Sequence, residues 1–304
     1  MTPRDVSAYL FLAIAWGLSF MCVVQAVHGF GWAGAVAFRA FIAAGTLLLI
    51  ARLRRKRLDF SCGIKPLMIV GATTVAGQLV FLSYGMPLIG TAMSAILVAT
   101  IPVFSMLIAR VWGVERLNGG AVAGIALGAL GILLLVGFPA VPVTADFLIG
   151  CAATLVATFS AAFGSVYAGR RLKGVGTSEA TIGAFISGGL IALPLLILAP
   201  VPGVPGLADI AALVTLGVVM SAATYVLYFG LINSIGPTRA ISVEFAVTGV
   251  AVLVGTILLG EPLSVPQIAG AVVIGLGCAL VLGLIRLPRG KRPAEVTPPA
   301  ASNG

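Results

Sequence analysis

Long apolar runs separated by short polar breaks make up most of the chain. Ten of these runs hold about 20 residues, the length at which a helix rising about 1.5 Å per residue crosses about 30 Å of hydrocarbon. Glycine and proline punctuate the breaks between them. We therefore predict an all-α membrane protein whose ten transmembrane helices span residues 8–27, 32–51, 66–85, 90–111, 119–138, 147–169, 179–199, 210–230, 237–259 and 266–285.

The composition supports this prediction. Hydrophobic residues make up 60 % of the chain and charged residues 9 %, whereas a soluble domain carries about a quarter charged residues. The net charge of +9 would suggest a nucleic-acid partner in a soluble protein, so the positions of the basic residues decide its meaning.

The basic residues alternate between the breaks. If the N-terminus is cytoplasmic, 17 of the 18 Lys and Arg residues fall in cytoplasmic segments, and Arg39 alone lies inside a span. This distribution follows the positive-inside rule. It predicts cytoplasmic N- and C-termini in a bacterial inner membrane, and it attributes the net charge to anionic lipid rather than to nucleic acid.

The chain also contains an internal repeat. Residues 90–137 match residues 236–283 without a gap at an offset of 146, including Glu115 with Glu261 and Gly131 with Gly277. Five spans per half is an odd number, so the second half enters the membrane from the opposite side. We predict two inverted five-helix repeats over residues 1–138 and 139–285, followed by a disordered cytosolic tail over residues 286–304.

Several short stretches combine small, aromatic and charged residues: Ala15-Trp16-Gly17 with Phe20, Phe38-Arg39, Pro102-Val103-Phe104, Glu115-Arg116-Leu117, Gly260-Glu261-Pro262-Leu263 and Gly270. In these stretches, and over residues 8–285, the chain resembles the EamA branch of the drug/metabolite transporter superfamily. The resemblance implies a metabolite carrier, usually an exporter, in which helices 1, 3, 4, 6, 8 and 9 line a central cavity and helices 5 and 10 stand at the two ends.

The resemblance also implies a proline in both fourth helices of the repeat. Pro102 fits this pattern, but its counterpart is Thr248. We expect Pro102 to kink helix 4 and shape the cavity, and helix 9 to lack the matching kink. Glu115 and Glu261 lie at breaks, where a carboxylate suits the start of the following helix.

Polar side chains inside the spans are the candidates for binding a substrate, because each is costly in hydrocarbon and tends to face the bundle interior. The alternative for Ser and Thr is close helix packing, with the hydroxyl bonded to a carbonyl of its own helix. The candidate substrate-binding residues are Trp16, Ser19, Gln78, Ser94, Thr100, Thr158, Tyr225, Tyr228, Glu244 and Thr248.

Two ionisable side chains lie well inside the spans. Glu244 is a candidate for taking up and releasing a proton as the cavity changes sides, or for binding a cationic amine; the alternative is a protonated acid bonded across a helix contact. Arg39 matches an arginine common in the family, and we expect a structural role near the outer end of helix 2. Their different depths disfavour a direct ion pair.

These features favour a secondary-active transporter, an exporter of amino acids or drug-like amphiphiles that works by alternating access with a possible proton coupling. A membrane-embedded transferase acting on a lipid-linked substrate is the alternative, but it needs a nucleophile beside a base or a metal-binding acidic cluster. The sequence predicts no enzyme activity, no cofactor, no ATP-binding loop and no metal site.

A passive pore is disfavoured because the predicted spans contain no rings of charged residues. We expect a monomer or a weak homodimer.

Overall fold

The computed structural model describes residues 2–113, 119–137, 142–236 and 240–281. Within these ranges every regular element is a helix and no strand occurs. Six of the described helices are long and apolar enough to cross a membrane, and three shorter apolar helices accompany them. The prediction of an all-α membrane protein is confirmed at this level.

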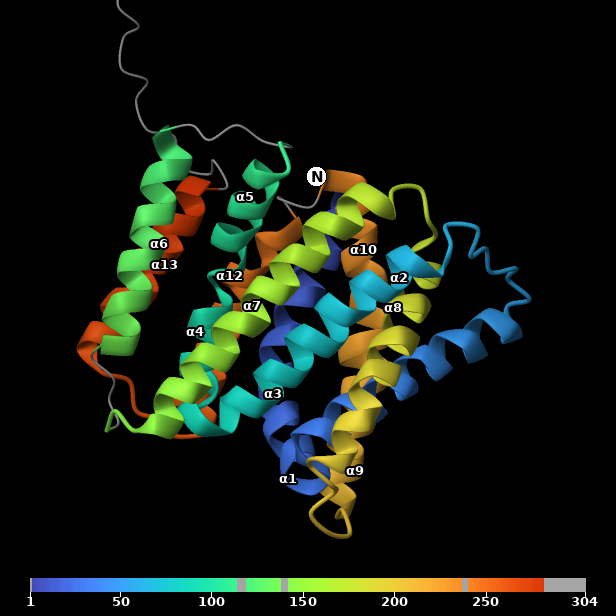
Figure 1. Cartoon of the computed structure of the whole chain (residues 1–304), viewed down its shortest axis with the longest axis horizontal. Helices are drawn as coiled ribbons and strands as arrows, with labels where there is room; N and C mark the ends of the chain where they lie inside the picture. Colours follow the sequence, from blue (N-terminus) through green and yellow to red (C-terminus); the bar gives the residue numbers. More distant parts are fainter. Residues whose placement is uncertain (1, 114–118, 138–141, 237–239, 282–304) are drawn as a thin grey trace, which may run out of the picture.

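The first two predicted spans form the two arms of α1 (Pro3–Leu53). Thr2 and Asp5 close a capping box at its start. Gly31 interrupts the helix with φ 69° and ψ 166°, a conformation that glycine adopts because it has no β-carbon. The chain therefore reverses direction at Gly31, and both arms of α1 appear in blue in Figure 1.

Several of the remaining spans contain a π-helical or 3₁₀ turn or a short break, which divides each into two or three elements. The rest of the first half consists of α2 (Ile64–Val70), η1 (Gly71–Gly77), α3 (Gln78–Ile89), α4 (Thr91–Val98), α5 (Ile101–Val111) and α6 (Gly119–Gly137). The second half consists of α7 (Ala145–Arg171), α8 (Thr177–Ala192), η2 (Leu193–Ile197), α9 (Leu207–Gly217), η3 (Val218–Ala223), α10 (Thr224–Ile235), α12 (Val243–Leu253), η4 (Val254–Leu258) and α13 (Val265–Val281).

The helices form a bundle with one pair set to the side. α6 and α13 pack against each other at one edge (Figure 1). A β-carbon at Gly277 would lie 2.7 Å from the carbonyl oxygen of Gly124, and one at Gly131 would lie 2.8 Å from that of Gly270. The two backbones can approach this closely because both contact positions are glycine.

The two breaks in the cavity-lining helices differ between the halves. α4 ends at Val98 and α5 begins at Ile101, which places Pro102 in the first turn of α5, where its missing N–H is tolerated. The prediction of a break near Pro102 is confirmed. At Thr248 the helix is continuous, as predicted, but a turn at Ser242 just before α12 interrupts the chain six residues earlier.

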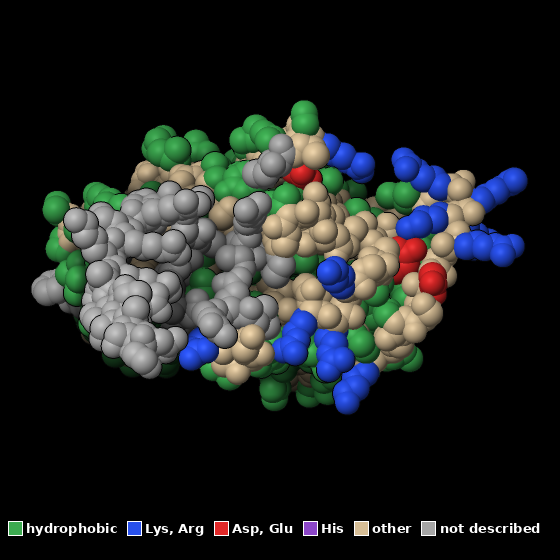
Figure 2. All heavy atoms as spheres, turned by 90° about the horizontal axis from the view of Figure 1, so that it is seen from above, with side chains coloured by type: hydrophobic (Ala, Val, Ile, Leu, Met, Phe, Trp, Pro, Cys, Tyr) green, Lys and Arg blue, Asp and Glu red, His purple; other side chains and the backbone are tan. Residues whose placement is uncertain are grey.

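The exterior of the bundle is apolar, and its charge is unevenly distributed. Large hydrophobic side chains such as Val111, Ile197 and Val265 are more than three-quarters exposed, as expected of surfaces that contact lipid. We call the face where α1 begins, at the top of Figure 1, the N-terminal face. Figure 2 shows Lys and Arg side chains gathered on this face.

Candidate functional site

A small cavity lies in the middle of the bundle, between helices of both halves. Its volume is about 60 Å³, space for a few water molecules. Its wall comes from both arms of α1, from η1, α3, α4 and α5, and from α7, α10 and α12. Seven of the sequence candidates line it: Trp16, Ser19, Arg39, Gln78, Tyr225, Tyr228 and Glu244.

Aromatic side chains of α1 and α10 form one side of the cavity. The ring of Trp16 makes edge-to-face contacts with Tyr225 at 5.5 Å and with Tyr228 at 5.2 Å between centroids. The Tyr225 hydroxyl donates to the Thr74 carbonyl oxygen at 3.3 Å, and the Tyr228 hydroxyl is 3.0 Å from Ser165 Oγ. The first bond holds Tyr225 against the first half of the chain, and the second holds Tyr228 against α7 of its own half.

Arg39 reaches into the cavity wall from the second arm of α1. Its Nε donates to Ser221 Oγ at 2.6 Å and its Nη2 donates to the Met220 carbonyl oxygen at 3.1 Å. Both partners belong to the π-helical turn η3 and both are neutral. The buried guanidinium is therefore hydrogen-bonded but not charge-compensated.

Glu244 approaches the same cavity from the first turn of α12, and its side chain is buried. Within the described residues, the ion pairs join His28 to Asp209 and Lys56 to Glu179, so none joins Glu244 to Arg39. The different depths that the sequence predicts for the two residues disfavour such a pair without excluding it. The cavity thus contains one acidic and one basic group, neither neutralised by the other.

Four polar candidates and Pro102 do not line this cavity. The hydroxyls of Thr100, Thr158 and Thr248 donate to carbonyl oxygens one turn earlier, at 2.6 to 2.8 Å. Thr248 also donates to the Ala95 carbonyl oxygen at 3.0 Å. The hydroxyl of Ser94 is buried without a hydrogen-bond partner. The three threonines therefore fit the alternative role in helix packing, because a short side chain can hydrogen-bond to a carbonyl oxygen of its own helix.

Further polar residues belong to the site. Ser165 and Thr74 line the cavity directly, and Ser221 holds Arg39. Ser221, Tyr225 and Tyr228 follow helical spacing across η3 and α10, so the periodicity of the sequence already grouped them on one face. Thr74 lies in the π-helical turn η1, for which the sequence offers no comparable pattern.

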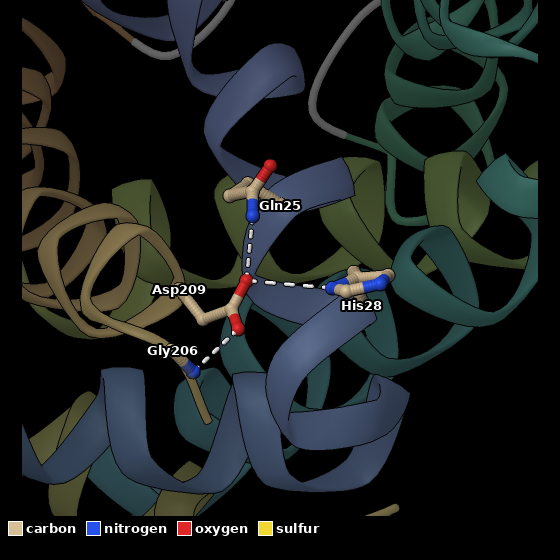
Figure 3. Close-up of polar contacts among 4 residues, drawn as sticks. All are labelled: Gln25, His28, Gly206 and Asp209. Carbon is tan, nitrogen blue, oxygen red and sulfur yellow. Dashed lines mark hydrogen bonds and ion pairs between the residues drawn. The ribbon is translucent and has the colours of Figure 1, made fainter. Parts of the chain in front are cut away.

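A second polar cluster joins α1 to α9 at the face opposite the N-terminal face. Figure 3 shows Gln25 and His28 of α1 directed toward Asp209. Gln25 Nε2 donates to Asp209 Oδ1 at 2.5 Å, His28 Nδ1 is 3.5 Å from the same oxygen, and the Gly206 N–H donates to Oδ2 at 2.8 Å. Gly29 provides the space for this approach, because a β-carbon there would collide with Asp209. We call this group the Asp209 cluster.

Glu261 binds a helix of the other half. Its two carboxylate oxygens accept from the N–H groups of Thr91 and Ala92, each at 2.7 Å, at the start of α4. The expectation that Glu261 anchors the helix following it is therefore wrong. Ser264 and Gln267 cap that helix instead, with hydrogen bonds of 2.9 and 3.2 Å. Glu115 lies outside the described residues.

Comparison with protein families decides which class of membrane protein this bundle is. The EamA-like transporter family matches twice, at residues 6–137 and at residues 148–283. The chain belongs to the EamA-like transporter family. This membership classes it as a transporter rather than an enzyme and overturns the transferase alternative.

Relatives of this EamA transporter include several proteins named as transporters. YoaV of Bacillus subtilis, named as an uncharacterized transporter, is 24 % identical over 88 % of this chain and 92 % of its own. YedA of Escherichia coli K12, named as an uncharacterized inner membrane transporter, is 28 % identical over 97 % and 96 %. A protein of Streptantibioticus cattleyicolor named as a probable terminal-alkyne amino-acid exporter is 27 % identical over 97 % and 98 %.

A solved crystal structure of another protein shares the fold of the EamA transporter. It superposes with a TM-score of 0.64 over 92 % of this chain and 96 % of its own, at 17 % sequence identity. At this identity the likeness concerns the fold alone.

Proposed function

We propose that this EamA transporter is a secondary-active exporter of small organic metabolites that carry both an acidic and a basic group, with amino acids as the first class to test and drug-like amphiphiles as the second. The observation that carries the proposal is the cavity lined by Arg39 and Glu244, which do not pair with each other. Burying an uncompensated charge is costly. A ligand with a carboxylate for Arg39 and an ammonium for Glu244 would compensate both. The name of the Streptantibioticus relative supports the same class.

We further propose that the transporter consists of ten spans in two inverted repeats, over residues 1–138 and 139–285. Reciprocal contacts support this arrangement. Gly71 packs on α8 near Gly188, while Gly217, which is 146 residues further along, packs on α1 at Ile42, which is 146 residues before Gly188. The bounds of α3 and α10 differ by the same offset. Helices related in this way suit alternating access.

Glu244 is the residue that we assign to proton coupling or to binding of the substrate amine. It lies on the cavity wall, and no described side chain bonds its carboxylate. A carboxyl group in this position can exchange a proton with water when the cavity opens to either side. Both halves of one chain supply the cavity wall, so the proposed site is complete in a monomer or in a weak homodimer.

Reconstituted vesicles provide the direct test of transport. We expect the purified chain to carry at least one zwitterionic amino acid faster than protein-free vesicles do, and an imposed pH gradient to change the rate. Radiolabelled amino acids, cationic amines and organic acids are compared in one panel. Failure of the whole panel would overturn the proposal, as would flux at channel-like rates that does not saturate with substrate.

We expect both termini to be cytoplasmic and the N-terminal face to be the cytoplasmic one. The basic side chains on this face support the assignment because cytoplasmic loops are rich in Lys and Arg. Single cysteines introduced at Lys56 and at Gly203 on a cysteine-free background report the two sides. An impermeant thiol reagent added to intact cells should label Gly203→Cys and spare Lys56→Cys. Labelling of the position in the 52–65 segment from outside would contradict this topology.

A further inference from the structure

One seam between helices runs through the whole molecule. α1 packs along α9, η3 and α10. Gln25 and Trp16 of its first arm contact α9 and α10. Arg39 and Ile42 of its second arm contact η3 and α9. The Asp209 cluster joins the two sides of the seam at the face opposite the N-terminal face. The rings of Trp16 and Tyr228 meet midway along it, beside the cavity. A groove separates the two sides at the N-terminal face.

The groove is large and amphipathic. Its volume is about 980 Å³, which is within the range of a site for a small molecule. Arg4, Ser7 and Asn233 contribute polar groups to it, while Phe11 and Leu227 contribute apolar surface. The groove can therefore accommodate a ligand that has a charged or polar end and an apolar side chain.

Neighbouring positions of the same two helices line the groove and the cavity. On α1, Phe11 lines the groove and Trp16 lines the cavity, five residues or about 7.5 Å further along. On α10, Leu227 lines the groove and Tyr228 lines the cavity. Trp16 and Tyr228 make an edge-to-face contact at the cavity wall, with ring centroids 5.2 Å apart.

The opposite end of the seam is closed by polar bonds. Asp209 accepts from Gln25 and from the Gly206 backbone, and Gly29 lets α1 and α9 come together there. The two sides of the seam are thus bonded through Asp209 at one face and separated by the groove at the N-terminal face. Passage to the opposite face along this seam needs the Asp209 cluster to break.

We propose that the groove between α1 and α10 is the entry site through which the transported zwitterion reaches the cavity from the N-terminal face, with Trp16 and Tyr228 as its gate. This inference rests on the proposed transport function. Its occupant is the transported molecule, because the same two helices line the groove and the cavity, and the groove offers both polar and apolar surface. A membrane lipid filling the groove is the competing occupant, and the test separates the two.

Gly230 is the position at which the groove can be filled without disturbing the helix. It lines the groove on α10, and a β-carbon there would meet Thr177 Cγ2 at 3.9 Å, an ordinary contact. We expect Gly230→Trp to fold normally and to lose about tenfold or more of the amino-acid flux in vesicles, equivalent to about 1.4 kcal/mol. Gly249→Trp is the matched control, because a β-carbon at this exposed position of α12 has no atom within 4 Å. It should retain the parental flux.

Gly230→Cys provides a second route to the same result. The rate of this variant before treatment is its own reference. Thiol reagents of increasing size should inhibit it progressively, while the parent chain treated in the same way reports the effect on the native cysteines. Inhibition that follows reagent size supports entry through the groove.

The possible outcomes separate the two hypotheses. Parental flux by folded Gly230→Trp, or an unchanged rate of Gly230→Cys after full modification, overturns the entry site and leaves the transport function standing. If Gly230→Trp changes the thermal stability conferred by added phospholipid but not the flux, the groove holds lipid and the inference is wrong. Lack of flux by the parent chain overturns the proposed function, and the entry site with it.

Discussion

Glu244→Gln is expected to fold normally and to lose about tenfold or more of the transport rate, equivalent to about 1.4 kcal/mol of lost interaction. Glutamine keeps the shape of the side chain but carries neither a charge nor an exchangeable acidic proton. The Glu244 carboxylate faces the cavity without a bonding partner among the described residues, so little of the packing depends on it. The remaining flux should also lose its response to an imposed pH gradient.

Measurement of the Glu244 effect needs a control for the loss of any buried carboxylate. Glu179→Gln supplies it, because Glu179 is equally buried but pairs with Lys56 at 3.0 Å, away from the cavity. Initial rates are normalised to the folded fraction from size-exclusion chromatography. The control should keep the pH response of the parent. A folded Glu244→Gln protein with parental rate and pH dependence would exclude both proposed roles of Glu244.

Gly277→Leu is expected to prevent the chain from accumulating as folded protein. A β-carbon at this position would lie 2.7 Å from the Gly124 carbonyl oxygen and 2.8 Å from the Gly128 nitrogen. Both are backbone atoms, so α6 and α13 would have to separate. Overpacking a tight contact typically costs about 1–3 kcal/mol, and a clash with backbone belongs to the upper part of that range.

Gly275→Leu is the matched control for Gly277→Leu, two residues away on the same helix. A β-carbon at Gly275 has no atom within 4 Å. Both substitutions change the helix propensity and the hydrophobicity equally, so only the contact with α6 differs. The yield of monodisperse protein after detergent extraction measures the effect. Equal yields of the two variants would show that the close approach of α6 and α13 is dispensable.

The spans were predictable because hydrocarbon imposes a length and an apolar composition on each helix. The composition of a span does not fix its internal geometry. The turn at Ser242 has no proline or glycine within four residues to announce it, whereas the break before Pro102 does. The π-helical turns η1 and η3 lie in ordinary apolar sequence and became visible only in the structure.

Side-chain length accounts for most of the difference between the candidates that line the cavity and those that do not, with Ser19, which bonds to its own helix but lines the cavity, as the exception. Gln78, Tyr225 and Tyr228 line the cavity because their polar groups extend beyond their own helix and need partners elsewhere. Thr100 and Thr158 bond to their own helices. The partner of Glu261 was hidden for another reason: the helix that it caps lies about 170 residues earlier in the chain, and only the packing of the two halves brings them together.

The hydrogen bonds of Glu261 couple hydration to any separation of the two halves at this end of the protein. Its carboxylate occupies the first two free N–H groups of α4, so the second half shields these groups of the first half from solvent. If the halves move apart at this end, an anion and two amides are uncovered together, and each needs water as its new partner. The two halves can therefore separate at this end only if water reaches the carboxylate and the two amides at the same time. In the alternating-access cycle proposed above, we expect osmolytes that withdraw water to slow this separation even where the substrate is saturating.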